Sequence, residues 1–170
     1  MKIVLIGFMG SGKTTVARVL AKKRNLNFID MDYLALKNTT RFSINEIFEK
    51  DGEEKFRELE LDVAKLMSQK ENCVISTGGG VVMNPKIMEY LKTNSVVIYL
   101  RKNFDRIKEH IALKKVRPPL FQTEESAKKL FEFRAPQYVQ YADMIIETDN
   151  KNIDKLIEEI DNKLGANYGR

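Results

Sequence analysis

The amino-acid sequence predicts an α/β domain of three layers, in which helices cover both faces of a five-stranded parallel sheet. Five short, continuous apolar runs alternate with segments of helical periodicity, which is typical of strands buried on both faces. The first run leads straight into a glycine-rich loop with a helical pattern after it. At 170 residues the chain is most simply one domain, 1–170, that is long enough to bury a core.

The first strand and the loop after it carry the central motif. Residues 3–6 are apolar and unbroken, and residues 7–14 read Gly-Phe-Met-Gly-Ser-Gly-Lys-Thr, a match to G-x-x-x-x-G-K-[ST]. Glycines let backbone N–H groups turn inward, while the following helix N-terminus and Lys13 add positive charge. The loop predicts a polyphosphate site. A chance glycine-rich turn is the alternative, but it does not require the strand and helix that flank this one.

Two acidic residues follow the second strand, residues 26–29. Ligands of open α/β sheets bind at the carboxyl ends of strands, so Asp30 and Asp32 are predicted beside the phosphate loop. One of them could merely cap the next helix, but capping hardly explains a pair. The hydroxyl of Thr14 is placed to bind Mg²⁺, with Asp30 as the acid on the metal side. Asp32 is then free to orient or deprotonate an acceptor hydroxyl.

The acid that usually ends a further strand beside such a loop is missing. The strands expected at 73–76 and 95–100 end in Ser76 and Leu100. This is why the metal side is assigned to Asp30.

Two helices are expected before the third strand. Residues 42–50 form a short amphipathic segment with Ser43 as N-cap, and residues 51–69 form a longer helix with an apolar stripe. Arg57 and Glu60 lie three residues apart beside that stripe and can meet on one face. Most such pairs are solvated salt bridges of little worth, so Arg57 gains meaning only in company.

The third strand, residues 72–76, runs into three consecutive glycines, Gly78, Gly79 and Gly80. Such a run costs backbone entropy and suits close approach of a ligand to the backbone. A tight connection between strand and helix is the purely structural alternative. The next helix starts at Pro85, which is tolerated in a first turn.

A lid is predicted after the fourth strand, residues 95–100, and the helix at 103–113. Residues 114–121 combine two prolines with several cations, so they cannot form a helix interior, and their charges must be solvated or placed on an anion. A lid at about 112–124 that closes over phosphates explains this composition. His110, the only histidine, is not assigned to catalysis.

The C-terminal part completes the pattern. We expect a helix at 124–133 that is kinked or restarted around Pro136, a fifth strand at 144–147, and a last helix from 153 that stops at Gly165. Arg57 and Arg134 could form a fork for a carboxylate, because guanidinium binds carboxylate bidentately. With the triple glycine beside them, the residues alone indicate phosphoryl transfer to a small hydroxylated acid.

Composition narrows the partners. The net charge of +5 is dispersed among acidic residues, which suits small anionic substrates better than nucleic acid. Cys73 is the only cysteine, so neither an intramolecular disulfide nor a thiolate metal cluster can form. We see no leader and no apolar run that could span a bilayer. We therefore expect a cytoplasmic monomer without membrane or nucleic-acid partners.

The motifs taken together resemble shikimate kinase. The resemblance rests on G-F-M-G-S-G-K-T-T, Asp30-x-Asp32, Phe56-Arg57 followed by Glu60, Ser76-Thr77-Gly78-Gly79-Gly80, Val116-Arg117-Pro118 and Arg134-x-Pro136-x-Tyr138. Many proteins share the phosphate loop, whereas the remaining set in this order is highly specific. The resemblance implies a fold like that of the nucleoside monophosphate kinases. It also implies phosphorylation of the 3-hydroxyl of shikimate by ATP, on the route to chorismate and aromatic amino acids.

The resemblance also implies roles for single residues. The residues implied for the ATP phosphates are Gly10, Ser11, Gly12, Lys13, Thr14 and Thr15, with Thr14 on one Mg²⁺ and Asp30 in its outer shell. Those implied for shikimate are Asp32, Arg57, Gly79 and Arg134, with Gly78 and Gly80 alongside, in a region that includes the helices at about 31–62. Arg117 is implied to descend with the lid onto the transferred phosphate, so that Lys13, Asp32 and Arg117 form the catalytic set. Lys151 falls where the family has a side chain near the adenine or ribose.

Two departures and two rival functions accompany this reading. The lid has Pro118-Pro119 where the family usually has a single proline, and His110 stands where some members place an arginine against adenine. Another P-loop kinase, for gluconate or a nucleoside monophosphate, is the nearest rival. A nucleotide-binding module without turnover is the other, but it would be expected to lose Lys13, Asp32 or Arg117.

Overall fold

The computed structural model describes residues 1–113 and 118–168. Arg117 and part of the expected lid lie outside the described residues. The strands are β1 (Lys2–Ile6), β2 (Asn27–Asp30), β3 (Cys73–Ser76), β4 (Val96–Arg101) and β5 (Met144–Glu147). The α-helices are α1 (Lys13–Arg24), α2 (Met31–Lys37), α3 (Ile44–Lys50), α4 (Gly52–Ser68), α5 (Pro85–Lys92), α6 (Phe104–Ala112), α7 (Glu124–Tyr141) and α8 (Ile153–Tyr168), and a 3₁₀ turn, η1 (Val81–Met83), precedes α5.

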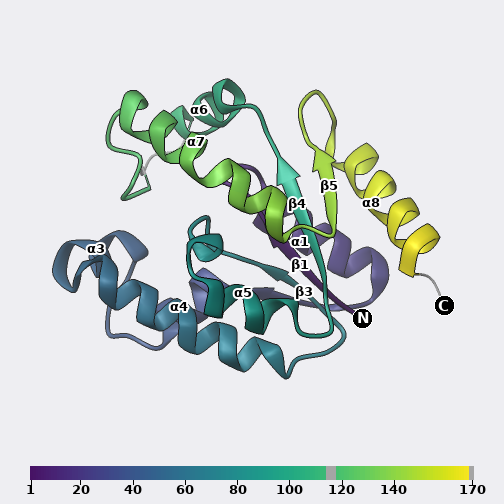
Figure 1. The fold of residues 1–170 in the computed structure, drawn as a ribbon, viewed down its shortest axis with the longest axis horizontal. Helices are drawn as coiled ribbons and strands as arrows, with labels where there is room; N and C mark the ends of the chain where they lie inside the picture. The colour runs from purple at the N-terminus through teal and green to yellow at the C-terminus, as the bar shows by residue number, and fades with distance from the viewer. Residues whose placement is uncertain (114–117, 169–170) are drawn as a thin grey trace.

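All five strands run parallel in one sheet of order β2-β3-β1-β4-β5 (Figure 1). β1 is central, so the loop that follows it emerges where the chain crosses from one half of the sheet to the other. The register pairs Ser76 of β3 with Leu5 on one side and with Asp30 on the other, which brings three carboxyl ends level. Open α/β sheets bind their ligands at such a switch point.

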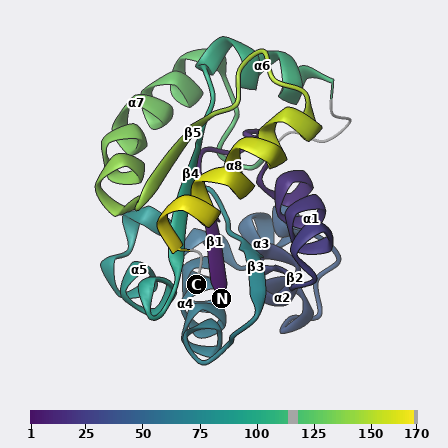
Figure 2. The same cartoon turned by 90° about the vertical axis from the view of Figure 1, so that its right-hand side faces the viewer.

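Alternate residues of the strands enter two separate cores. In β1, Val4 and Ile6 pack with residues of α4, α5 and α7, whereas Ile3 and Leu5 pack with residues of α1 and α8. Figures 1 and 2 show these two groups of helices on opposite faces of the sheet. The predicted three-layer α/β architecture with five parallel strands is confirmed.

The helices near the carboxyl edge begin in two different ways. Asp30 caps α2 by accepting a hydrogen bond from the Tyr33 N–H, and Ser43 caps α3, as predicted, by accepting one from the Glu46 N–H. Helix α1 begins after Gly12, which has no side chain to offer. The first N–H groups of α1 therefore face no competing cap, which is the arrangement that suits an anion.

Two predicted helix boundaries are wrong. The helix predicted to end at residue 133 and to be kinked or restarted around Pro136 is a single helix, α7, which runs from Glu124 to Tyr141 and is therefore not restarted. A proline interior to a helix costs one hydrogen bond and a steric clash, but Arg134 and Tyr138 on either side are buried, and this packing holds the turn. Helix α8 continues past Gly165 to Tyr168, because Gly165 does not adopt the left-handed conformation of a C-terminal cap.

None of the described helices is both long enough and apolar enough to cross a membrane.

Candidate active site

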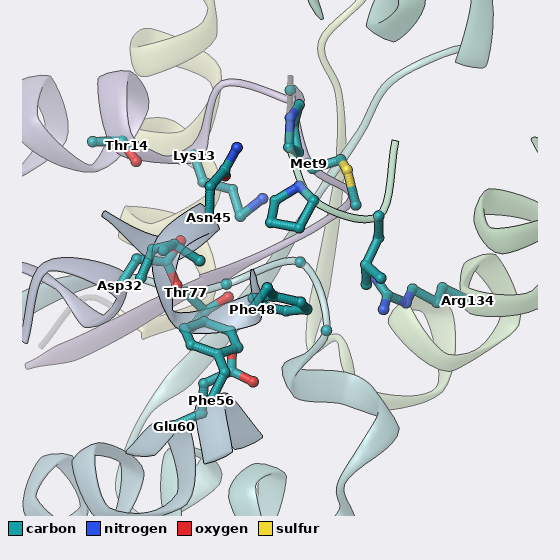
Figure 3. A pocket seen from close by; sticks show the side chains of 18 of the residues that line it. Met9, Lys13, Thr14, Asp32, Asn45, Phe48, Phe56, Glu60, Thr77 and Arg134 are labelled. Atoms are coloured by element: carbon teal, nitrogen blue, oxygen red, sulfur yellow. The ribbon is translucent and has the colours of Figure 1, made fainter. Parts of the chain in front are cut away.

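The carboxyl edge of the sheet opens into a cavity of about 330 Å³. Most of the predicted site residues line it, namely Gly10, Gly12, Lys13, Thr14, Thr15, Asp32, Arg57, Gly78, Gly79, Gly80 and Arg134. Figure 3 shows Arg134 entering from the side opposite to Asp32 and Thr14, with Lys13 and Met9 along the upper wall and Glu60 below. The structure thus brings together segments that lie far apart in the sequence, from Gly10 to Arg134.

The loop between β1 and α1 holds its lysine in a folded position. Lys13 is only 7 % exposed, and its Nζ donates hydrogen bonds to the carbonyl oxygens of Gly7 (2.8 Å) and Phe8 (2.9 Å). The ring of Phe8 is buried and meets Phe131 of α7 edge-on, with 5.3 Å between centroids, which anchors the loop to the helical layer. Ser11 is buried within the loop and does not line the cavity.

Thr14 lies where two strands end. Its hydroxyl oxygen is 3.4 Å from Oδ2 of Asp30 and 3.1 Å from Oγ of Ser76. Oδ1 of Asp30 caps α2 at the same time, so the capping alternative holds for Asp30 while its second oxygen still faces Thr14. One carboxylate and two hydroxyls are oxygen ligands of the kind that Mg²⁺ prefers. In the part of the chain that the structure describes, no cluster of three or more His, Cys, Asp or Glu residues forms a metal site.

Asp32 and Glu60 place two carboxylates next to Gly78. Oδ1 of Asp32 and Oε1 of Glu60 are buried and have no hydrogen-bond partner among the described residues. Burial, together with the charge of Asp30, raises the pKa of Asp32 to about 6, against the opposing charges of Lys13 and Arg57. Burial also raises the pKa of Glu60, although Arg57 opposes it. Buried, unpartnered acceptors at a cavity wall are suited to a hydroxylated ligand.

Arg57 is held by acids on its own helix and by aromatic rings. Its guanidinium donates to Glu60 (2.5 Å) and to Glu53 (2.8 Å), so the predicted Arg57–Glu60 pair forms. The same group lies 5.4 Å from the centre of the Phe56 ring and 6.0 Å from that of Phe48, which is within cation–π range. A positive charge is thereby fixed at the cavity wall with few rotamers left open to it.

Arg134 supplies a second guanidinium from α7. Its side chain is 4 % exposed, and its Nε is buried without a hydrogen-bond partner among the described residues. Since a buried donor without a partner is costly, its place at the cavity wall marks it as a group that awaits an acceptor. Arg57 and Arg134 both line the cavity, as the predicted carboxylate fork requires.

Each of the three consecutive glycines lies close to a different neighbour. A Cβ at Gly78 would lie 2.5 Å from Oε1 of Glu60 and 2.8 Å from Oδ1 of Asp32. At Gly79 it would lie 3.0 Å from the backbone nitrogen of Met9, and at Gly80 it would lie 2.5 Å from the Arg57 guanidinium. The run therefore lets one backbone segment contact the acids, the phosphate loop and the arginine at once.

Other predicted residues are not brought to this cavity. Lys151 does not line it, and its ammonium forms an ion pair with Glu159 of α8. Arg117 lies outside the described residues. His110, which was not assigned a catalytic role, does line the cavity, as do Pro118 and Pro119 of the predicted lid.

Sequence reasoning missed several residues of the site. Ser76 was given no role in the site beyond its place in a motif and at the end of a strand without an acid, yet its hydroxyl contacts that of Thr14. The strand register that places Ser76 beside Asp30 is not visible in the sequence. Phe48 and Phe56 belong to the apolar faces predicted for residues 42–50 and 51–69, but they also line the cavity beside Arg57. Tyr138, quoted only within a motif, donates a hydrogen bond from its hydroxyl group to the carbonyl oxygen of Gly79.

Comparison with known proteins identifies the family of this chain. The family model described as shikimate kinase matches residues 9–165. A shikimate kinase of Lactococcus lactis subsp. lactis is 41 % identical over 98 % of this chain and 100 % of its own length. The solved shikimate kinase from Acinetobacter baumannii in complex with shikimate is 32 % identical, with a TM-score of 0.92 over 99 % of this chain and 95 % of that one.

A more distant structure defines the wider fold. The deoxyadenosine kinase from M. mycoides with bound dCTP has a TM-score of 0.65 over 98 % of this chain and 100 % of that one, at 20 % identity. At this identity the likeness shows the fold alone, which is the kind of nucleotide-kinase architecture that the resemblance implied.

Proposed function

This chain belongs to the shikimate kinase family, and from that premise we propose that it transfers the γ-phosphoryl group of ATP to the 3-hydroxyl of shikimate. The products are shikimate 3-phosphate and ADP, on the route to chorismate and aromatic amino acids. The observation that carries the proposal is a single cavity in which the phosphate loop faces a buried carboxylate and two guanidinium groups. Such a cavity matches a donor phosphate on one side and a hydroxylated acid on the other.

The donor side is built from the phosphate loop. Backbone N–H groups of residues 10–15 at the start of α1 bind the phosphates of ATP, and Lys13 turns from the carbonyl oxygens of Gly7 and Phe8 toward the β- and γ-phosphates. Binding at a helix start also places the phosphate charge at the positive end of the helix dipole. The loop thus holds the γ-phosphate at the wall that faces the acceptor.

The donor set beside the loop fits Mg²⁺. Thr14 is proposed as the direct ligand and Asp30 as the outer-shell acid, and Ser76 completes a group of oxygens that lie within 3.4 Å of the Thr14 hydroxyl. When bound, the ion neutralises charge on the phosphate oxygens. Asp30 is kept in place by the cap that it forms on α2.

The acceptor side holds shikimate by its two kinds of polar group. Arg57 and Arg134 bind the carboxylate of shikimate. The backbone of Gly79 contacts shikimate between the two arginines. Asp32 accepts the proton of the 3-hydroxyl while the hydroxyl oxygen of shikimate forms a bond to the γ-phosphorus of ATP. The bond between that phosphorus and the β,γ-bridging oxygen breaks at the same time. The proton ends on Asp32 and the bridging oxygen leaves with ADP.

A lid at about 112–124, with Arg117 on it, completes the proposal. Pro118, Pro119 and Leu120 already line the cavity, and a cation that descends with this segment would neutralise the phosphate in transfer. We expect amide hydrogen exchange over residues 112–124 to slow when ATP and shikimate are both bound, as measured by mass spectrometry. Unaltered exchange contradicts closure. Lys151 beside the adenine or ribose belongs to the same proposal.

The state of the protein in the cell is also proposed. We expect a monomer in the cytoplasm, because the dispersed charge and the small anionic substrates call for no macromolecular partner.

The decisive experiment is an assay of ADP release with Mg-ATP against a panel of acceptors. The panel contains shikimate, gluconate and nucleoside monophosphates, and phosphate transfer to the acceptor is followed by mass spectrometry. We expect ADP release to depend on shikimate alone. Transfer to gluconate or to a nucleotide identifies one of the rival kinases, and ATP binding without transfer to any acceptor identifies the module without turnover.

A further inference from the structure

A tyrosine that the proposed reaction does not use lies between the two elements that hold the acceptor. Tyr138 is fully buried at 0 % exposure, and its hydroxyl donates a hydrogen bond of 2.5 Å to the carbonyl oxygen of Gly79. It lies four residues after Arg134 on α7, so both side chains project from the same face of that helix. One helix therefore supplies both a proposed substrate ligand and a bond to the acceptor loop.

The ring of Tyr138 is fixed independently of its hydroxyl. It stacks on Tyr99 of β4, with 5.0 Å between ring centroids and 25° between planes. Burial raises the pKa of Tyr138, so the phenol stays protonated and remains a donor throughout the working pH range. The stacking fixes the orientation of the ring, and this orientation points the hydroxyl group toward the carbonyl oxygen of Gly79.

Gly79 is confined from its other side as well. A Cβ placed on it would lie 3.0 Å from the backbone nitrogen of Met9 in the phosphate loop. The peptide of Gly79 is thus packed against the donor loop on one side and hydrogen-bonded to α7 on the other. A small displacement of the acceptor slows phosphoryl transfer strongly. The hydrogen bond from α7 to Gly79 therefore helps to set the distance between the acceptor loop and the phosphate loop.

We propose that Tyr138 is a positioning residue, whose hydroxyl joins the triple-glycine loop to α7 so that Gly79 and Arg134 meet the acceptor as one rigid unit. This inference rests on the proposed function. A tyrosine that only fills the core acts through its ring, and phenylalanine can replace it. A positioning tyrosine acts through its hydroxyl, and the same replacement leaves the partly buried Gly79 carbonyl without its donor.

The test is Tyr138→Phe, with Tyr99→Phe as the matched control. Tyr99 belongs to the same stacked pair and is 2 % exposed, but its hydroxyl makes no hydrogen bond with a described residue. For Tyr138→Phe we expect the KM for shikimate to rise about tenfold and kcat to fall several-fold, while the KM for ATP stays within about twofold. For Tyr99→Phe we expect all three constants to stay near those of the parent protein.

Two outcomes overturn the inference. One is that Tyr138→Phe and Tyr99→Phe give the same kinetic constants, which assigns Tyr138 to the core alone. The other is an equal loss for ATP and shikimate, which is the sign of a general distortion. Failure of the parent protein to phosphorylate shikimate is a separate result, because it contradicts the proposed function rather than the role of Tyr138.

A double-mutant cycle sharpens the same test. If Tyr138 acts by aligning Arg134 with Gly79, its hydroxyl matters less once the guanidinium is gone. We expect Tyr138→Phe to raise the shikimate KM by clearly less in an Arg134→Ala background than in the parent protein. Full additivity of the two losses contradicts alignment of the two groups and overturns the inference in this form.

Discussion

The site is made of two glycine-rich loops that differ in why most of their glycines are needed. In the phosphate loop, Gly10 and Gly12 have φ angles of 79° and 94°, and a Cβ on Gly12 would meet nothing within 4 Å. In the acceptor loop no residue from Gly78 to Gly80 has such an angle, but a Cβ on any of them would come within 3.0 Å of another atom. At Gly10 and Gly12 the donor loop needs glycine for its conformation, although a Cβ at Gly7 would also lie 2.8 Å from the carbonyl oxygen of Leu100. The acceptor loop needs glycine for space alone.

This difference separates the two halves of the reaction experimentally. A loop that needs a special conformation loses its shape when it is substituted, and its anion site changes with it. A loop that needs space forces its neighbours to move, and those neighbours are the side chains that hold the acceptor. Variants on each side should therefore affect one substrate, and variants at the contact between the loops should affect both.

The largest effect on the acceptor side is expected from Asp32→Asn. The amide cannot take up the hydroxyl proton, and a positioned base contributes roughly 10²–10⁴-fold to rate. We expect kcat to fall by about that factor, while ATP binding measured by calorimetry stays within about twofold. Unchanged turnover in this variant contradicts the assignment of Asp32 as the base.

The contact between the loops is tested by Gly79→Ala. The new Cβ would lie 3.0 Å from the Met9 nitrogen, and backbone cannot give way as a side chain can. We expect a loss of about 10²-fold in kcat/KM for both substrates, as befits a change in their spacing.

Gly12→Ala is the matched change within the donor loop, because it adds strain without a clash. It should weaken ATP binding and leave the shikimate KM near that of the parent protein. If Gly79→Ala and Gly12→Ala change the constants for ATP and shikimate in the same way, the proposed difference between the two loops is wrong.

Removal of one guanidinium has an intermediate effect. Arg57→Ala is expected to raise the Kd for shikimate about 10–100-fold, since a charge-assisted pair with a carboxylate is worth roughly 1.5–3 kcal/mol. The Kd for ATP should change by less than about threefold. Arg41→Ala is the control, because Arg41 pairs with Asp51 outside the cavity. Equal losses for both ligands in calorimetry count against a role on the carboxylate.

The smallest effect is a dependence of stability on pH. Burial raises the pKa of Asp32 from 3.8 to about 6, because the folded state favours the protonated acid. The free energy of unfolding therefore contains a favourable contribution from this proton, which is present at low pH and is lost as pH rises through about 6. Asp32→Asn does not ionise there. It should therefore melt higher than the parent protein at pH 7.5, by about 2–4 °C for each kcal/mol, and by a smaller margin at pH 4.5. A margin that does not change with pH contradicts the raised pKa.

Much of the fold could be predicted because its signals are local. Each strand is a short apolar run, each amphipathic helix shows its period, and the loop at residues 7–14 has a motif whose mechanism requires the flanking strand and helix. Asp30, Asp32, Arg57 and Arg134 could be assigned to the strand-end face for the same reason. The identity of the acceptor came from the family resemblance and not from the residues alone.

The rest depended on neighbours that a single sequence does not name. Periodicity does not state which strands pair, so the contact between Ser76 and Thr14, which follows from the register of β2 with β3, went unnoticed. Proline at position 136 predicted an interruption because its local cost is known, whereas the burial of Arg134 and Tyr138 that outweighs it is tertiary. At Pro136 packing overrode the local signal, whereas at Gly165 the glycine does not adopt the left-handed conformation that ends a helix.

The folded position of Lys13 makes nucleotide binding an exchange. Its ammonium already satisfies the carbonyl oxygens of Gly7 and Phe8, so a phosphate that recruits it must displace those bonds. The free energy gained is then the difference between two occupied states of the same cation. Lys13 thus acts as the loop's own internal ligand, and the affinity for ATP depends on how well the loop binds itself.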